Sequence, residues 1–125
     1  MSEIDILSFG ETMAMLVAEQ TGDLATVEHF HKRIAGADSN VAIGLSRLGF
    51  NVAWLSRVGA DSLGRFVLDT LQGEGLDCSQ VEVDPLHPTG FQFKSREDAG
   101  ADPQVEYFRK GSAASHLSTQ AIQPS

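Results

Sequence analysis

The first part of the chain consists of extended segments separated by turns. Residues 4–9, Ile-Asp-Ile-Leu-Ser-Phe, are short, apolar and rich in β-forming side chains, and they end at Gly10, which predicts a strand that breaks into a turn. Residues 13–18 predict a second extended segment. Residues 29–34 alternate in character, which is typical of a half-exposed strand.

After a small-residue turn, the period of the apolar positions becomes helical and predicts a helix over about residues 39–48. Its apolar positions follow i, i+4, i+7 spacing and are Val41, Leu45 and Leu48. We expect Ser39 to cap this helix and Gly49 to end it. Residues 51–56 then predict a buried strand, and the order strand, helix, strand implies a parallel α/β unit.

A second helix is expected after a glycine-containing turn, with Asp61 or Ser62 as its cap and residues 73–75 as its end. The apolar face of this helix is formed by Leu63, Phe66, Val67 and Leu71.

Residues 89–94 alternate again, and a polar connection that contains Gly and Pro leads from them to residues 105–109, which predicts a hairpin.

Composition and charge narrow the classes of function. The chain has 125 residues, 42% of them hydrophobic, with 9 Lys and Arg against 17 Asp and Glu, so its net charge is −8. This acidic balance argues against a nucleic-acid partner. No apolar run approaches the roughly 18–20 residues of a membrane span, so we expect no membrane partner. The single Cys78 excludes an internal disulfide, and a cytoplasmic location is expected.

Several familiar kinds of site are disfavoured. The chain contains neither Gly-x-Gly-x-x-Gly nor a P-loop motif. His29 and His31 would lie on one face of a strand, but no third ligand is near them, so solvated strand residues are favoured over a metal site. Cys78 has no recognisable base beside it, and we expect a buried, inert thiol rather than a nucleophile.

The main functional signal is a bend of small residues with spaced glycines. It begins with Ala-Gly-Ala-Asp-Ser-Asn at 35–40 and comprises Gly36, Asn40, Gly49 and Gly59. This pattern resembles the first signature of the ribokinase-like, or PfkB, family of sugar kinases. Asp38 stands where the family pattern prefers Gly, Ala or Pro, a departure that we relate to substrate subclass.

Two further stretches are similar to the branch of the family that phosphorylates 2-keto-3-deoxygluconate. They are Phe-Gly-Glu-Thr-Met at 9–13 and Tyr-Phe-Arg-Lys-Gly-Ser-Ala-Ala-Ser at 107–115. The resemblance extends from about residue 6 to 117. It implies an α/β fold class, namely the N-terminal portion of a ribokinase-like three-layer α/β fold with a small β-sheet lid.

The resemblance also implies a division of the chain. Residues 1–125 would form the N-terminal part of a kinase domain, and the C-terminal ATP-binding half would be absent. The core would comprise about 4–10 and 35–83, and the lid about 11–34 and 84–111. An α/β domain with helices on both faces of its sheet usually needs a longer chain than this one, which favours the same interpretation.

Five residues are expected to bind substrate by this resemblance: Gly36, Asn40, Gln92, Tyr107 and Arg109. Gly36 would let the backbone approach a ligand, and Asn40 offers a donor and an acceptor to hydroxyls. Arg109 could grip a carboxylate with two hydrogen bonds, and Tyr107, two residues earlier, would face the same way.

Each of these assignments has a structural alternative. Gly36 could serve only the turn, and Asn40 only the start of the helix. Arg109 and Lys110 could be an exposed cationic pair, and Tyr107 could pack against Phe93 and Phe108. Asp61 is expected to cap a helix rather than to act as a catalytic acid. The sequence assigns no catalytic residue and no metal ligand.

The resemblance implies ATP-dependent phosphorylation of 2-keto-3-deoxygluconate, a small-molecule sugar acid. ATP and Mg²⁺ are expected for the full-length family enzyme, but neither is expected to bind this chain alone. The chain contains nothing like the family's Gly-Ala-Gly-Asp motif with its catalytic Asp, so we expect it to be inactive alone. The alternatives are a non-catalytic module that binds a sugar acid or forms a homodimer through the β-lid, and a chain that does not fold stably.

Overall fold

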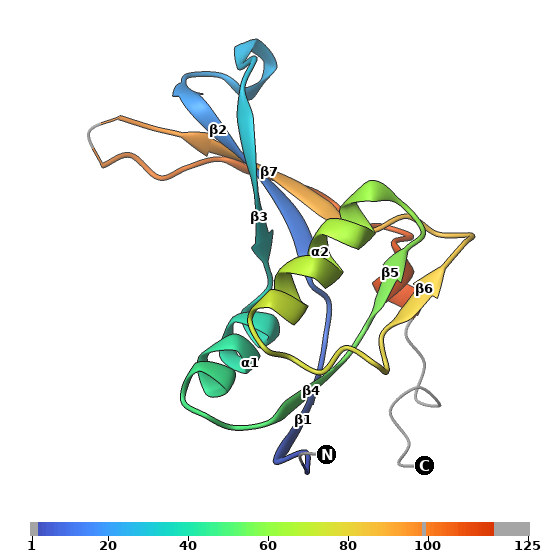
Figure 1. Cartoon of the computed structure of the whole chain (residues 1–125). Coiled ribbons are helices and arrows are strands. Elements are labelled where there is room, and N and C mark those ends of the chain that lie inside the picture. The colour runs from blue at the N-terminus through green and yellow to red at the C-terminus, as the bar shows by residue number, and fades with distance from the viewer. Residues whose placement is uncertain (1–2, 99, 117–125) are drawn as a thin grey trace.

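The part of the chain that the structure describes, residues 3–98 and 100–116, contains three small sheets, two α-helices and two short 3-10 helices (Figure 1). The structure is a computed structural model. In chain order, its elements are β1 (Ile6–Phe9), β2 (Met13–Thr21), η1 (Leu24–Thr26), β3 (Phe30–Ala35), α1 (Ala37–Arg47), β4 (Val52–Leu55), β5 (Arg57–Gly59), α2 (Ser62–Gly73), β6 (Glu82–Asp84), β7 (Phe91–Arg96), β8 (Val105–Phe108) and η2 (Ala113–His116).

Parallel strand pairs form the base of the fold. β1 pairs in parallel with β4, with Ile6 opposite Val52, and β5 pairs in parallel with β6. α1 packs against β1 and β4, whereas α2 packs against β5 and β2. No helix among the described residues is both long and apolar enough to cross a membrane.

The other four strands form a separate sheet in the order β3-β2-β7-β8, which we call the lid sheet. β2 is antiparallel to β3 and parallel to β7, and β7 and β8 form an antiparallel hairpin. In Figure 1 this sheet extends upward, beyond α1 and α2. The predicted extended segments near 13–18, 29–34, 89–94 and 105–109 all contribute strands to it.

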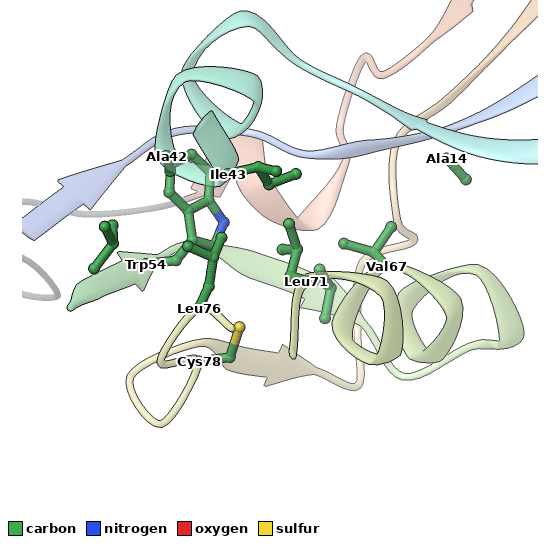
Figure 2. Packing of buried hydrophobic residues seen from close by; sticks show 10 residues of the cluster. Ala14, Ala42, Ile43, Trp54, Val67, Leu71, Leu76 and Cys78 are labelled. Carbon is green, nitrogen blue, oxygen red and sulfur yellow. The ribbon is translucent and has the colours of Figure 1, made fainter. Parts of the chain in front are cut away.

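The core lies where the two helices meet the parallel strands, around Trp54, which is fully buried (Figure 2). Figure 2 shows the Trp54 indole beside Ala42 and Ile43 of α1, with Leu76 below it. The rest of the buried cluster is formed by Ala14, Val52, Val58, Val67, Leu71 and Cys78. This core fixes α1 against β4 and thereby holds the first turn of α1, which carries part of the site.

The first helix differs from the prediction in its cap and in its buried face. The N-cap is Gly36 rather than Ser39, because the helix begins two residues earlier and the Ser39 hydroxyl donates to the Gly36 carbonyl. The predicted apolar face was wrong at two of its three positions, because Val41 and Leu48 are 62% and 77% exposed, whereas Leu45 packs against the core. The buried positions of α1 are instead the two small residues Ser39 and Ala42, together with Ile43. The bulky Trp54 indole fills the space beneath the helix, so small side chains face it.

The parallel unit exists, but its partner strand is not the one that the order of elements suggested. β4 pairs with β1, whereas β3, which directly precedes α1, pairs only with β2 in the lid sheet. β2 and β3 are therefore an insertion between the two strands of the unit. Gly49, with φ of +102°, ends α1 as predicted. The second helix and the hairpin are confirmed.

Candidate functional site

A hollow of about 430 Å³ opens where the lid sheet meets the first turn of α1. Its volume lies in the range of small-molecule sites. It is lined by Glu11, Met13, Ala35, Gly36, Ala37, Asp38, Gln92, Tyr107 and Arg109, and we call it the Gly36–Arg109 pocket. Four of the five residues predicted to bind substrate therefore line one hollow, although they come from segments up to 73 residues apart, 109 − 36.

Gly36 forms one wall of this pocket and occupies a backbone conformation that favours glycine. Its φ and ψ are 148° and 123°, and it is the N-cap of α1. A Cβ at this position would lie 2.6 Å from the Glu11 carbonyl oxygen and 2.8 Å from the Ser39 hydroxyl. The turn and the pocket wall are thus the same feature, because the missing side chain lets the backbone of α1 approach the Glu11 segment.

Tyr107 and Arg109 form the opposite wall, and they face the same way, as their spacing predicted. The Arg109 guanidinium carbon lies 5.0 Å from the centroid of the Tyr107 ring. Gln92 lies directly across from Tyr107 in the β7–β8 register, and it is only 7% exposed. This wall therefore combines one cation, one phenol and one buried amide.

Tyr107 does not take part in the aromatic packing considered as the alternative. The rings of Phe30, Phe91, Phe93 and Phe108 contact one another across the lid sheet. Phe108 follows Tyr107 directly on β8, so the two side chains point to opposite faces of the sheet. The phenylalanines occupy one face of the lid sheet, and Tyr107 occupies the pocket face.

Asn40 is the one predicted site residue outside this pocket. It is exposed, and it lines a neighbouring hollow of about 490 Å³ between β3, α1 and α2. Its backbone N–H donates to the Gly36 carbonyl, so it lies one helical turn beyond the pocket wall. The other lining residues of that hollow are Lys32, Arg33, Ile34, Ile43, Gly44, Arg47, Phe66, Thr70 and Glu74. The structure therefore does not bring Asn40 together with Arg109.

Two carboxylates in the pocket were not predicted from the sequence. Glu11 follows the first strand, and one of its carboxylate oxygens accepts a hydrogen bond of 2.8 Å from the Ser112 hydroxyl. Asp38 stands in the first turn of α1, where a negative charge interacts favourably with the helix dipole. The signal for Glu11 was its place in the Phe-Gly-Glu-Thr-Met stretch, and the signal for Asp38 was its departure from the family pattern.

The segment that leads into the lid sheet is fixed to the core by Asp61, whose cap role is confirmed. Its carboxylate accepts hydrogen bonds from the Gly64 N–H, the Thr89 N–H and the Thr89 hydroxyl, at 2.8, 3.0 and 2.8 Å. Burial acts to raise the pKa of Asp61, but these hydrogen bonds outweigh it and lower the pKa. The same carboxylate thus caps α2 and holds Thr89, just before β7.

A second carboxylate, Asp84, anchors the start of this segment. The Leu86 backbone N–H donates to it, Arg57 Nε lies 3.0 Å from it, and His87 Nδ1 lies 2.8 Å from it. The hydrogen bond from Leu86, assisted by His87 and Arg57, holds the pKa of Asp84 at about 2 despite its burial. Both ends of the segment 84–89 are therefore tied to the parallel strands or to α2.

Cys78 and His31, two other reactive side chains in the described part of the chain, have structural surroundings that do not indicate a further site. Burial, together with the nearby Asp77 carboxylate, raises the pKa of the Cys78 thiol to about 11, in agreement with an inert thiol. His31 accepts a hydrogen bond from Arg33 Nε, and its Nδ1 lies 3.7 Å from Glu19. Within residues 3–98 and 100–116, no three His, Cys, Asp or Glu side chains are grouped to hold a metal ion.

Comparisons with known proteins agree on one family. The model described as pfkB family carbohydrate kinase matches residues 3–123. The chain is 51% identical over 118 residues to a 2-dehydro-3-deoxygluconokinase of Bacillus subtilis (strain 168), covering 94% of this chain and 36% of that protein. It is 35% identical over 123 residues to a 2-dehydro-3-deoxygluconokinase of Thermoproteus tenax, covering 98% of this chain and 38% of that protein.

The solved structures agree with the sequence comparisons. The crystal structure of a PfkB protein from Polaromonas sp. JS666 superposes with a TM-score of 0.92 at 53% identity. The match covers 97% of this chain and 40% of that one. The chain thus spans less than half the length of each of these relatives.

Proposed function

The chain belongs to the pfkB family of carbohydrate kinases and has its ribokinase-like α/β fold, and from this membership we propose that it binds the sugar-acid substrate in the phosphorylation of 2-keto-3-deoxygluconate by ATP. The observation that supports the proposal is the Gly36–Arg109 pocket, in which a single guanidinium faces hydrogen-bonding side chains. The names of the relatives support the same substrate class.

Arg109 suits the carboxylate of a sugar acid. A guanidinium can donate two parallel hydrogen bonds to a carboxylate, which a neutral sugar does not require. The Tyr107 ring, 5.0 Å from the Arg109 guanidinium carbon, favours one orientation of that group by a cation–π interaction. The buried Gln92 amide offers both a donor and an acceptor beside them. This wall therefore binds the acid end of the substrate, and the Gly36 backbone confines the ligand on the other side.

The nucleotide is not assigned to this pocket. The lining holds one cation, Arg109, and two carboxylates, Glu11 and Asp38, so it does not suit a triphosphate. ATP supplies the phosphoryl group and Mg²⁺ neutralises its charge during transfer, and no residue of the pocket is assigned to either. We therefore propose that the 125-residue chain binds the sugar acid without sugar-dependent ATP turnover. Turnover that follows the chain through purification would contradict this part of the proposal.

The substrate assignment can be tested by calorimetric titration of the chain with 2-keto-3-deoxygluconate. Replacing the charge-assisted hydrogen bonds of Arg109 in Arg109→Met should raise the Kd by about tenfold or more, since such bonds contribute roughly 1.5–3 kcal/mol each. Lys110→Met is the matched control, because Lys110 is an exposed neighbouring cation outside the pocket, and its Kd should change less than about threefold. Equal effects of the two variants would remove Arg109 from the carboxylate role.

A specific feature of the lid sheet favours a second candidate function, homodimerisation of a module that binds a sugar acid without catalysis. The phenylalanine cluster lies on the face opposite Tyr107, and Phe108 is 48% exposed. A hollow of about 360 Å³ lies over this face, lined in part by Phe30, Phe93 and Phe108. An exposed aromatic face on a sheet is suited to pairing with a second copy of the chain.

Sedimentation of the wild-type chain and of Phe108→Ser tests this second function. We expect a wild-type dimer that the substitution weakens, and a monomeric wild-type chain would exclude this function.

A further inference from the structure

The carboxylate of Glu11 lies where three segments of the chain meet. Glu11 itself stands between β1 and β2 and lines the Gly36–Arg109 pocket. A Cβ built on Gly90, which directly precedes β7, would lie 2.5 Å from Glu11 Oε2 and 3.2 Å from the Cβ of Arg109. The carboxylate therefore packs on the bare backbone of Gly90, beside the base of the Arg109 side chain. Any larger residue at 90 would displace it.

Ser112 also holds this carboxylate in place. The Ser112 hydroxyl donates to Glu11 Oε2 at 2.8 Å, and the two residues are 101 positions apart in the sequence. Ser112 is 1% exposed, and its backbone is fixed by the bond from its N–H to the Arg109 carbonyl. A buried donor with a fixed backbone keeps the acceptor in one orientation. The position of the Glu11 carboxylate thus depends on the segment that follows β8.

Among the described residues, only one oxygen of this carboxylate accepts a hydrogen bond. Within the described residues, Ser112 donates to Oε2, and no side chain or backbone group donates to Oε1. A carboxylate accepts hydrogen bonds and donates none, so the second oxygen is suited to a hydroxyl of a ligand. The acid end of the same ligand would be repelled by Glu11 and attracted by Arg109.

We propose that Glu11 determines specificity for a hydroxylated ligand in the Gly36–Arg109 pocket, and that Ser112 is the residue that positions it. This inference rests on the proposed function, because it takes Arg109 as the partner of the ligand's carboxylate. The pocket then offers two chemically distinct groups, a guanidinium for the acid group and a fixed acceptor for a hydroxyl. A ligand with a carboxylate and no hydroxyls satisfies only the guanidinium, and it leaves the Oε1 atom of Glu11 desolvated without a donor.

The test compares two ligands that share a carboxylate and a keto group. Calorimetric titration of the chain with 2-keto-3-deoxygluconate and with 2-oxohexanoate, which lacks the three hydroxyls, gives the ratio of the two dissociation constants. We expect the wild-type ratio to favour the hydroxylated acid, and Glu11→Gln to reduce this preference by about tenfold or more, since hydrogen bonds to a charged group are the stronger ones. Glu28→Gln is the matched control, since Glu28 is exposed and does not line the pocket.

Ser112→Ala separates positioning from direct contact. It leaves the carboxylate in the protein but removes its donor, so we expect a smaller loss of preference, about threefold. The double variant Glu11→Gln with Ser112→Ala should show the same ratio as Glu11→Gln alone, because Ser112 acts only through Glu11. Additional loss in the double variant would show that Ser112 acts by another route and would overturn its positioning role. Thermal melts of all variants establish that the ratios are measured on folded protein.

The outcomes distinguish this inference from the proposed function. Wild-type binding of the sugar acid with an unchanged ratio in Glu11→Gln would overturn the specificity role and leave the proposed function standing. Equal weakening of both ligands in Glu11→Gln would also overturn it, because hydroxyl recognition requires a selective effect. Failure of the folded wild-type chain to bind 2-keto-3-deoxygluconate would overturn the proposed function and this inference with it. If Glu11→Gln does not fold, an unchanged ratio in Ser112→Ala overturns the inference.

Discussion

Replacing Gly36 by alanine tests whether the bend before α1 is set by backbone geometry. The new Cβ would lie 2.6 Å from the Glu11 carbonyl oxygen and 2.8 Å from the Ser39 hydroxyl, both closer than real Cβ atoms approach such groups. The φ of 148° also lies in a region that residues other than glycine avoid, which costs about 1–3 kcal/mol. Overpacking adds about 1–3 kcal/mol. We therefore expect Gly36→Ala to lower the free energy of unfolding by roughly 2–6 kcal/mol.

Trp54 provides the assay for this prediction. It is the single tryptophan of the chain and is fully buried, so its fluorescence reports global unfolding in urea. The matched control is Gly44→Ala on the same helix, where a Cβ meets nothing within 4 Å. Because alanine favours a helix interior over glycine, this variant should be more stable by about 0.5–1 kcal/mol. A change of less than about 0.5 kcal/mol in Gly36→Ala would refute the assignment of Gly36 as a position that requires glycine.

Three further predictions concern the anchors of the lid sheet and the core. Asp61→Ala removes the cap of α2 and leaves the buried Thr89 without its acceptor. The free energy of unfolding measured in urea should therefore fall by roughly 2–4 kcal/mol. The control Asp69→Ala, on the exposed face of α2, should change this free energy little. Asp84, whose pKa is about 2 in the fold against about 3.9 unfolded, contributes stability that is complete above about pH 5 and disappears as pH falls toward 2. Asp84→Asn should therefore flatten the loss of stability measured between pH 5 and 2, and an unchanged slope would exclude this source. The Cys78 thiol, with its pKa near 11, should react with a thiol reagent at pH 8 only when urea unfolds the chain, and rapid labelling of native protein would contradict its burial.

Local signals in the sequence predicted the bend before α1, the shared strand face of Tyr107 and Arg109, and the cap of α2. The glycine at 36 and the alternation of Tyr107 and Arg109 are visible within a few residues of chain, because turns and strand faces depend on near neighbours. The cap at Asp61 was predictable for the same reason. The family resemblance, rather than these local signals alone, named the four residues that line the pocket together, and their role in binding substrate stays a prediction.

Other features depend on partners that are distant in the sequence. Glu11 became a pocket residue only because Ser112 and Gly90 pack against its carboxylate, and no periodicity marks such a contact. Asn40 is separated from Arg109 because it lies one helical turn beyond Gly36 and lines the hollow between β3, α1 and α2 instead. A motif gives the order of residues along the chain but not the distance between their side chains.

The sequence by itself determined the extended segments, the second helix with its cap, the glycine at the bend and the family to which the chain belongs. Tertiary structure alone decided that β4 pairs with β1, that Ala42 rather than Val41 faces the core, and that Glu11 shares a pocket with Arg109. The physical reason is the distance along the chain over which each interaction acts. Propensity, capping and periodicity act between residues within a few positions, whereas strand pairing and burial depend on the volume of side chains such as Trp54 that arrive from elsewhere in the chain.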